Sequence, residues 1–106
     1  MGWDLKPIKP SSNAPQYLSD PKRRTGAIWG RYNMIGWLTL IAFLKKWDVD
    51  VREFSSTNYG EAISAETCEK VAAALEKHLP DLRQSDRAWL EPHIILWKTS
   101  GGYRQL

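Results

Sequence analysis

The chain has 106 residues, a formal net charge of +3 and a single cysteine. This length fits one domain with a modest core, and one cysteine excludes an internal disulfide and a multi-cysteine zinc site. The longest apolar run, residues 34–44, is shorter than the ~20 residues that a membrane-spanning helix needs. Residues 1–10 lack the basic-then-apolar order of a secretory signal, so we expect a cytoplasmic protein that makes no use of the membrane.

Prolines dominate residues 1–26, where four of the chain's six occur. Each proline lacks an amide donor and biases the residue before it toward extended backbone. The segment therefore predicts an extended arm without a helix or a central strand. It also holds five Lys or Arg against two Asp, which accounts for the whole net charge and leaves residues 27–106 neutral. The arm's only basic run is Lys22, Arg23 and Arg24.

Residues 33–47 predict the first helix. Asn33 is a good N-cap, and apolar residues recur with the helical period at positions 34, 37, 38, 41 and 44. Positions 40, 43 and 47 are apolar as well, so only a narrow polar stripe remains. A helix that is apolar almost all round is typical of the centre of a domain. Gly36 inside it suggests a close approach of another backbone.

Residues 47–54 alternate apolar and polar side chains, and this is the one short strand that the sequence suggests. The stretch FSSTNYGEAIS at 54–64 follows, in which Asn58 and Gly60 favour a turn. We interpret it mainly as the entry to the next helix. If it is instead a functional loop, the residues to test are Ser55, Ser56, Thr57, Asn58 and Tyr59.

Residues 65–79 have the clearest helical pattern, with apolar residues at positions 68, 71, 72, 75 and 79. Ser64 is placed as the N-cap, and Pro80 ends the helix. Cys68 lies on the apolar stripe, so we interpret it as a small core residue rather than a nucleophile. Ile63 is expected to pack against Cys68 from just before the cap.

A further helix is expected to begin at Asp86, with Ser85 as its cap. Pro92 would either break this helix or begin a second piece, and Gly101 and Gly102 would supply the C-terminal cap. Together the patterns predict a compact, mainly α domain of three or four helices over residues 27–106. The extended arm of residues 1–26 precedes it.

The common phosphate, metal and nucleophile motifs are absent, among them G-x-x-x-x-G-K-[ST], H-E-x-x-H, C-x-x-C and G-x-S-x-G. We therefore predict no catalytic residue, no metal site and no cofactor. A small enzyme would need Cys68 to meet His93 or His78 and to have a lowered thiol pKa. It is the least favoured hypothesis.

Six tryptophans are unusual for this length. Most are expected in the core, but tryptophan is also enriched at the energetic centres of interfaces. With a neutral domain and no catalytic motif, the leading hypothesis is a non-enzymatic protein-interaction module with a Trp-rich helical surface. Its partner would be another protein or a second copy of the chain. The candidate partner-binding residues are Trp37, Trp47, Trp97, Asn58 and Tyr59.

The alternative hypothesis is an accessory protein that binds nucleic acid through Lys22, Arg23 and Arg24. A basic run that is followed by a neutral domain gives only a small electrostatic footprint for nucleic acid. Nucleic acid is therefore the less favoured partner.

The pattern N-x-G-x-x-I-S-A-E, from Asn58 to Glu66, precedes the alanine-rich helix, and S-G-G-Y, from Ser100 to Tyr103, lies near the end. With these motifs the chain resembles a group of small bacterial proteins in which an Asn-containing glycine loop precedes the central helix and an S-G-G-aromatic segment closes the domain. The resemblance covers residues 29–106 and leaves out the arm. The group has no established activity, so the resemblance implies no function.

Overall fold

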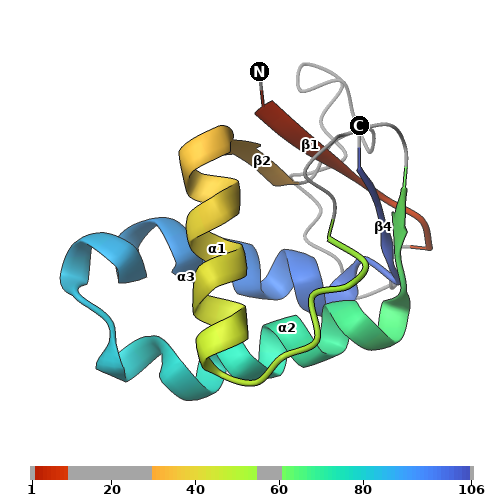
Figure 1. Cartoon of the computed structure of the whole chain (residues 1–106). Coiled ribbons are helices and arrows are strands. Elements are labelled where there is room, and N and C mark those ends of the chain that lie inside the picture. The colour runs from red at the N-terminus through yellow and green to blue at the C-terminus, as the bar shows by residue number, and fades with distance from the viewer. Residues whose placement is uncertain (1, 10–29, 55–60, 106) are drawn as a thin grey trace.

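A computed structural model describes residues 2–9, 30–54 and 61–105 of the chain. These residues form three α-helices, one short 3-10 helix and four short strands (Figure 1). The strands are β1 (Gly2–Pro7), β2 (Gly30–Asn33), β3 (Ala62–Ile63) and β4 (Tyr103–Gln105), and the helices are α1 (Met34–Lys46), α2 (Ala65–His78), η3 (Leu79–Asp81) and α3 (Gln84–Thr99). The predicted mainly α class is confirmed, and the radius of gyration of 13.0 Å is that of a compact chain of this length.

The four strands form one antiparallel sheet in the order β2-β1-β4-β3 (Figure 1). β1 is a central strand, in which Leu5 pairs with Gly30 of β2 and with Gln105 of β4. The prediction that residues 1–26 hold no central strand is therefore wrong. Pro7 is tolerated because it is the last residue of β1, where a missing amide removes little pairing. The remainder of the predicted arm, residues 10–26, lies outside the described residues.

α1 begins where the sequence predicts, because Asn33 Oδ1 accepts a hydrogen bond from the Gly36 amide at 2.7 Å. The buried side chains are Trp37, Leu40 and Leu44, which share one face of the helix. The sequence suggested that Gly36 allows another backbone to approach closely. In the structure it instead leaves room for the Asn33 cap. A Cβ at that position would lie 3.2 Å from the Asn33 side-chain oxygen.

Residues 48–54 form the irregular exit from α1, and the predicted strand over residues 47–54 is absent. Asp48 has a left-handed φ of 60°, and the Val49 amide donates back to the Leu44 carbonyl at 2.8 Å, which closes the helix in a tight turn. Asp50 Oδ1 then accepts from the Arg52 amide at 2.9 Å. Such local bonds compete with strand pairing, so the alternating apolar residues pack half-buried against the core without a partner strand.

α2 agrees with the helix predicted over residues 65–79. The Ser64 hydroxyl accepts a hydrogen bond from the Thr67 amide at 3.2 Å, as a cap should. The buried residues of the helix are Cys68, Val71, Ala72 and Leu75. They pack along α3, which returns antiparallel to α2 after η3 (Figure 1).

α3 begins at Gln84, two residues before the predicted start, and Arg83 rather than Ser85 holds the N-cap position. Pro92 lies inside the helix and does not divide it. Burial of Leu90 and Leu96 on either side of the proline offsets its cost of about 3 kcal/mol. The predicted glycine cap is confirmed, since Gly101 has a φ of 66° directly after the helix.

Aromatic rings fill the core between the sheet and the helices. Trp97 Nε1 donates to the Tyr32 hydroxyl at 3.1 Å, and the Trp97 ring contacts Tyr103 edge-on with centroids 4.9 Å apart. Phe54 stacks on Trp97 and contacts Trp37 with the two rings tilted. The Tyr103 hydroxyl is buried without a hydrogen-bond partner among the described residues, and burial raises the pKa of Tyr32 and of Tyr103.

Candidate functional site

Among the described residues, the large apolar side chains with the highest exposed fractions lie on the outer side of α1. Met34 is 53 % exposed, Ile35 78 % and Leu38 50 %. They share one side of the helix with three further exposed residues toward its C-terminus. We name this surface the α1 face, and it consists of Met34, Ile35, Leu38, Ala42, Lys45 and Lys46.

Among the described residues, α1 packs against the domain mainly through the opposite side, where Trp37, Leu40 and Leu44 are buried, and this leaves the α1 face exposed. A helix that is apolar all round is normally covered all round. The prediction that this helix lies at the centre of its domain is therefore wrong for its outer half. Contiguous exposed apolar residues are a feature that interaction surfaces share.

A groove of about 530 Å³ adjoins the α1 face between the first half of α1 and the first half of α3. One wall is aromatic, since Trp89 lies edge-on to Tyr32 at 6.3 Å and His93 packs on Tyr32 at 4.8 Å between ring centroids. Burial lowers the pKa of His93, so its imidazole is neutral at pH 7. The lining residues are Tyr32, Asn33, Ile35, Gly36, Thr39, Arg83, Asp86, Trp89 and His93.

Asp86 supplies the negative charge of this groove. Its side chain is only 16 % exposed, and Oδ1 accepts a hydrogen bond from Trp89 Nε1 at 3.2 Å. Oδ2 lies 3.5 Å from Nε of Arg83, whose side chain is 84 % exposed. An ion pair with one such exposed partner is weak, so Asp86 can accept a second cation from outside.

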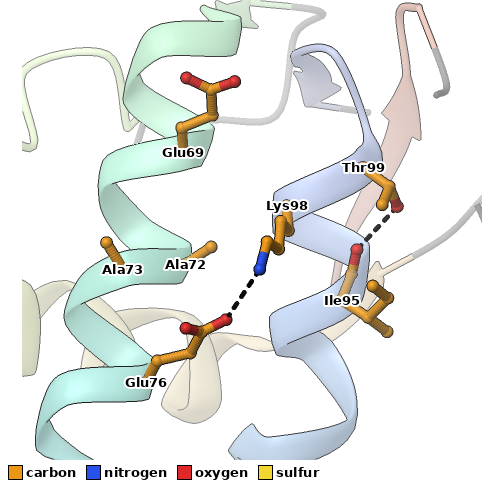
Figure 2. Close-up of a pocket in the computed structure, with 7 residues that line it drawn as sticks. All are labelled: Glu69, Ala72, Ala73, Glu76, Ile95, Lys98 and Thr99. Atoms are coloured by element: carbon orange, nitrogen blue, oxygen red, sulfur yellow. Dashed lines mark hydrogen bonds and ion pairs between the residues drawn. The ribbon is translucent and has the colours of Figure 1, made fainter. Parts of the chain in front are cut away.

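A second groove, of about 560 Å³, lies between α2 and α3. Ala72 and Ala73 are the small residues of its α2 wall, and Figure 2 shows that Lys98 reaches across from α3 to Glu76. The Lys98 ammonium lies 3.5 Å from the Glu76 carboxylate, and the Thr99 hydroxyl donates to the Ile95 carbonyl at 2.7 Å. These polar groups already interact with one another or with the backbone. The α1 face, whose apolar side chains are uncovered, is therefore the stronger candidate for a binding surface.

Glu53 reinforces the start of α2 and has a structural role. Its carboxylate accepts hydrogen bonds from the Ser64 amide at 3.1 Å, from the Ser64 hydroxyl at 3.0 Å and from the Thr67 hydroxyl. These bonds stabilise the carboxylate and hold the pKa of Glu53 below its usual value, with the Thr67 hydroxyl as the largest cause. The carboxylate also lies at the positive end of the helix dipole.

The sequence-predicted partner-binding residues fall in three places. Trp37 and Trp97 are fully buried in the core, so neither side chain is on the surface of this fold. Trp47 is half-buried, with its ring stacked between Phe43 at 5.3 Å and His78 at 4.5 Å. Asn58 and Tyr59 lie outside the described residues, as do Lys22, Arg23 and Arg24. The nucleic-acid hypothesis therefore stays a prediction.

The exposed residues of α1 were missed because the helical period assigned them to the core. Met34 and Leu38 belong to the apolar stripe that predicts burial, while the structure buries Leu40 in their place. The available signal was the apolar circumference of the helix, since so small a domain can hardly cover all of it.

Cys68 bears on the hypothesis of a Cys/His enzyme. Its thiol is buried, and Sγ lies 4.0 Å from the Ile63 carbonyl oxygen. Burial raises the pKa of Cys68 to about 11, so the thiol is protonated at neutral pH. His78 stacks on Trp47 and His93 packs on Tyr32, so both imidazoles have other neighbours. The arrangement gives no support to a thiolate nucleophile.

Within residues 2–9, 30–54 and 61–105, no cluster of three or more His, Cys, Asp or Glu side chains is arranged to hold a metal ion. No helix in the same part of the chain is both long and apolar enough to cross a bilayer. No protein-family model matches the sequence, and neither a curated protein nor a solved structure matches it. The resemblance to small bacterial proteins thus stays an expectation.

Proposed function

We propose that this chain is a protein-binding domain and that the α1 face is its contact surface. The observation that carries the proposal is the exposure of Met34, Ile35 and Leu38 on a helix that has only a narrow polar stripe. Covering these three side chains completely would contribute about 3–5 kcal/mol, when the burial of each is scaled by its present exposure. That is a useful share of the binding energy of a micromolar complex, which is about 8 kcal/mol.

The character of the partner follows from the charges around the apolar centre. Lys45 and Lys46 end the helix, and α1 itself contains no acidic residue. The partner therefore presents an apolar segment with a carboxylate near the position that the two lysines reach. Complementary charge of this kind favours correct orientation and speeds association.

The proposal is tested with a photo-reactive benzophenone amino acid at Leu38, expressed at native level in cells of the source organism. Irradiation should give a covalent adduct with a discrete polypeptide. The matched control places the same amino acid at Ala88, an exposed position of α3, where no such adduct should form.

A second variant, Leu38→Glu, should compete poorly with the wild-type chain for adduct formation, because it places a charge in the apolar centre. Equal adducts from Leu38 and Ala88, or none from either, would overturn the proposal.

A further inference from the structure

We propose that the partner on the α1 face is a second copy of this chain, with the two α1 helices packed antiparallel about a two-fold axis. This inference rests on the proposed function of the α1 face. It is carried by the order of side chains along α1, in which large apolar residues come first, Ala42 follows, and Lys45 and Lys46 end the helix. An isologous dimer requires a surface that complements itself when it is reversed.

The apolar centre meets this requirement. If the two-fold axis passes beside position 40, the middle of Met34–Lys46, then residue 38 of each copy faces residue 42 of the other. The large Leu38 side chain lies over the small Ala42 side chain, twice by symmetry. Large and small residues that face one another in this way interdigitate closely. Ile35 lines the groove on the same side of α1 as Lys46, so the aliphatic stem of Lys46 from the other copy can cover it while the ammonium stays in water.

The charged ends also match. In the same register Lys46 of one copy is level with Met34 of the other, next to the groove that holds Asp86. Lys46 and Thr39 are seven residues apart, about two helical turns, so they project on the same side of α1. Thr39 lines the groove. Lys46 therefore points to the groove side.

The two-fold axis is perpendicular to both helices and lies in the plane of contact. The groove sides of the two α1 helices therefore point in the same direction. Each Lys46 thus reaches the groove of its partner. Within the described part of the chain, the one ion pair of Asp86 there is the weak one with the exposed Arg83. Arg83 is the cation that opposes this contact. Its side chain is free to turn into solvent because it is 84 % exposed.

The first test is the mass of the full chain in solution, measured by analytical ultracentrifugation from 1 to 300 µM. We expect a concentration-dependent dimer. Leu38→Glu should weaken dimerisation by about 30-fold or more, as substitution at the centre of an interface does. Lys77→Glu is the matched control, because Lys77 is exposed on α2. It should leave the dimer unchanged, and circular dichroism checks that both variants are folded.

The register is tested by disulfide trapping between two differently tagged chains, one Leu38→Cys and one Ala42→Cys. Mild oxidation should link them, because facing Cβ atoms are close enough for a disulfide. A chain with Ala88→Cys in place of Ala42→Cys should not link. Charge exchange gives a further check, since Lys46→Asp and Asp86→Lys should each weaken the dimer about tenfold and the double variant should restore it.

A monomer throughout the concentration range would overturn this inference. If the Leu38 adduct then forms with a different polypeptide, the proposed function stands without the dimer. If neither a dimer nor an adduct forms, both proposals fail. A dimer that is unaffected by Leu38→Glu would place the interface elsewhere and would also overturn the inference.

Discussion

Replacing Gly101 by alanine should destabilise the domain strongly, because two separate effects act at this residue. Gly101 has a φ of 66°, in the left-handed region. A residue with a Cβ is less stable there by about 1–2 kcal/mol. A Cβ at this position would also lie 2.0 Å from the backbone oxygen of Lys9. No rotation of a side chain relieves that overlap, so the backbone after β1 must move.

The movement would break hydrogen bonds that join β1 to the end of α3. The Ile8 amide donates to the Gly102 carbonyl at 2.9 Å, and the Lys9 amide donates to the Ser100 carbonyl at 3.1 Å. Each contributes about 1 kcal/mol. With the backbone term, the free energy of unfolding should fall by about 3–4 kcal/mol. For a domain of this size the melting temperature should fall by about 15 °C or more.

Gly36→Ala is the matched control. Gly36 lies within α1, where alanine gains about 1 kcal/mol in helix propensity. Its Cβ would lie 3.2 Å from Asn33 Oδ1, which is a side-chain atom and can shift slightly. The variant should stay within about 1 kcal/mol of the wild type. Urea unfolding followed by circular dichroism measures both values. A Gly101→Ala variant as stable as Gly36→Ala would refute the close contact with Lys9.

Three further predictions concern buried or capping polar groups. Tyr32→Phe should lower stability by about 1–3 kcal/mol because it leaves Trp97 Nε1 unpaired. Tyr103→Phe should be neutral or stabilising, because the Tyr103 hydroxyl has no hydrogen-bond partner among the described residues. Urea unfolding distinguishes the two variants. Because the pKa of Glu53 is lower in the folded state, its carboxylate stabilises the fold above the unfolded pKa of about 4.5, and this stabilisation is lost as pH falls through the lower folded pKa. In Glu53→Gln the free energy of unfolding should therefore depend less on pH below about 4.5. Gln105→Ala should cost about 2–3 kcal/mol in thermal melts, since its buried amide donates to two backbone carbonyls.

The helices could be predicted from the sequence because their signals are local. Asn33 and Ser64 each cap a helix within three residues, and the glycine pair after α3 ends it at the expected point. The sheet could not be predicted in this way. Its central pairing joins Leu5 to Gln105 at opposite ends of the chain, and β3 and β4 are too short to show a period of two. Only the folded helices bring these segments together.

The candidate site was harder to predict for a different reason. Periodicity identifies the buried face of a helix only when the opposite face is polar. In α1 the buried positions Trp37, Leu40 and Leu44 and the exposed positions Met34 and Leu38 are all apolar. The pattern therefore gave the helix correctly and left its orientation undetermined. Tertiary packing decides which half faces the core.

The exposed apolar side chains on the outer side of α1 are the reason to expect this helix at an interface. A surface helix that only had to fold this domain would need apolar side chains on the Trp37 side alone. Met34, Ile35 and Leu38 each keep half or more of their surface exposed, and apolar surface in contact with water is unfavourable by about 25 cal/mol per Å². A second molecule that covers the α1 face would recover this energy. A second copy of the chain matches this surface, because in an antiparallel pair Leu38 faces Ala42 and Lys46 reaches Asp86.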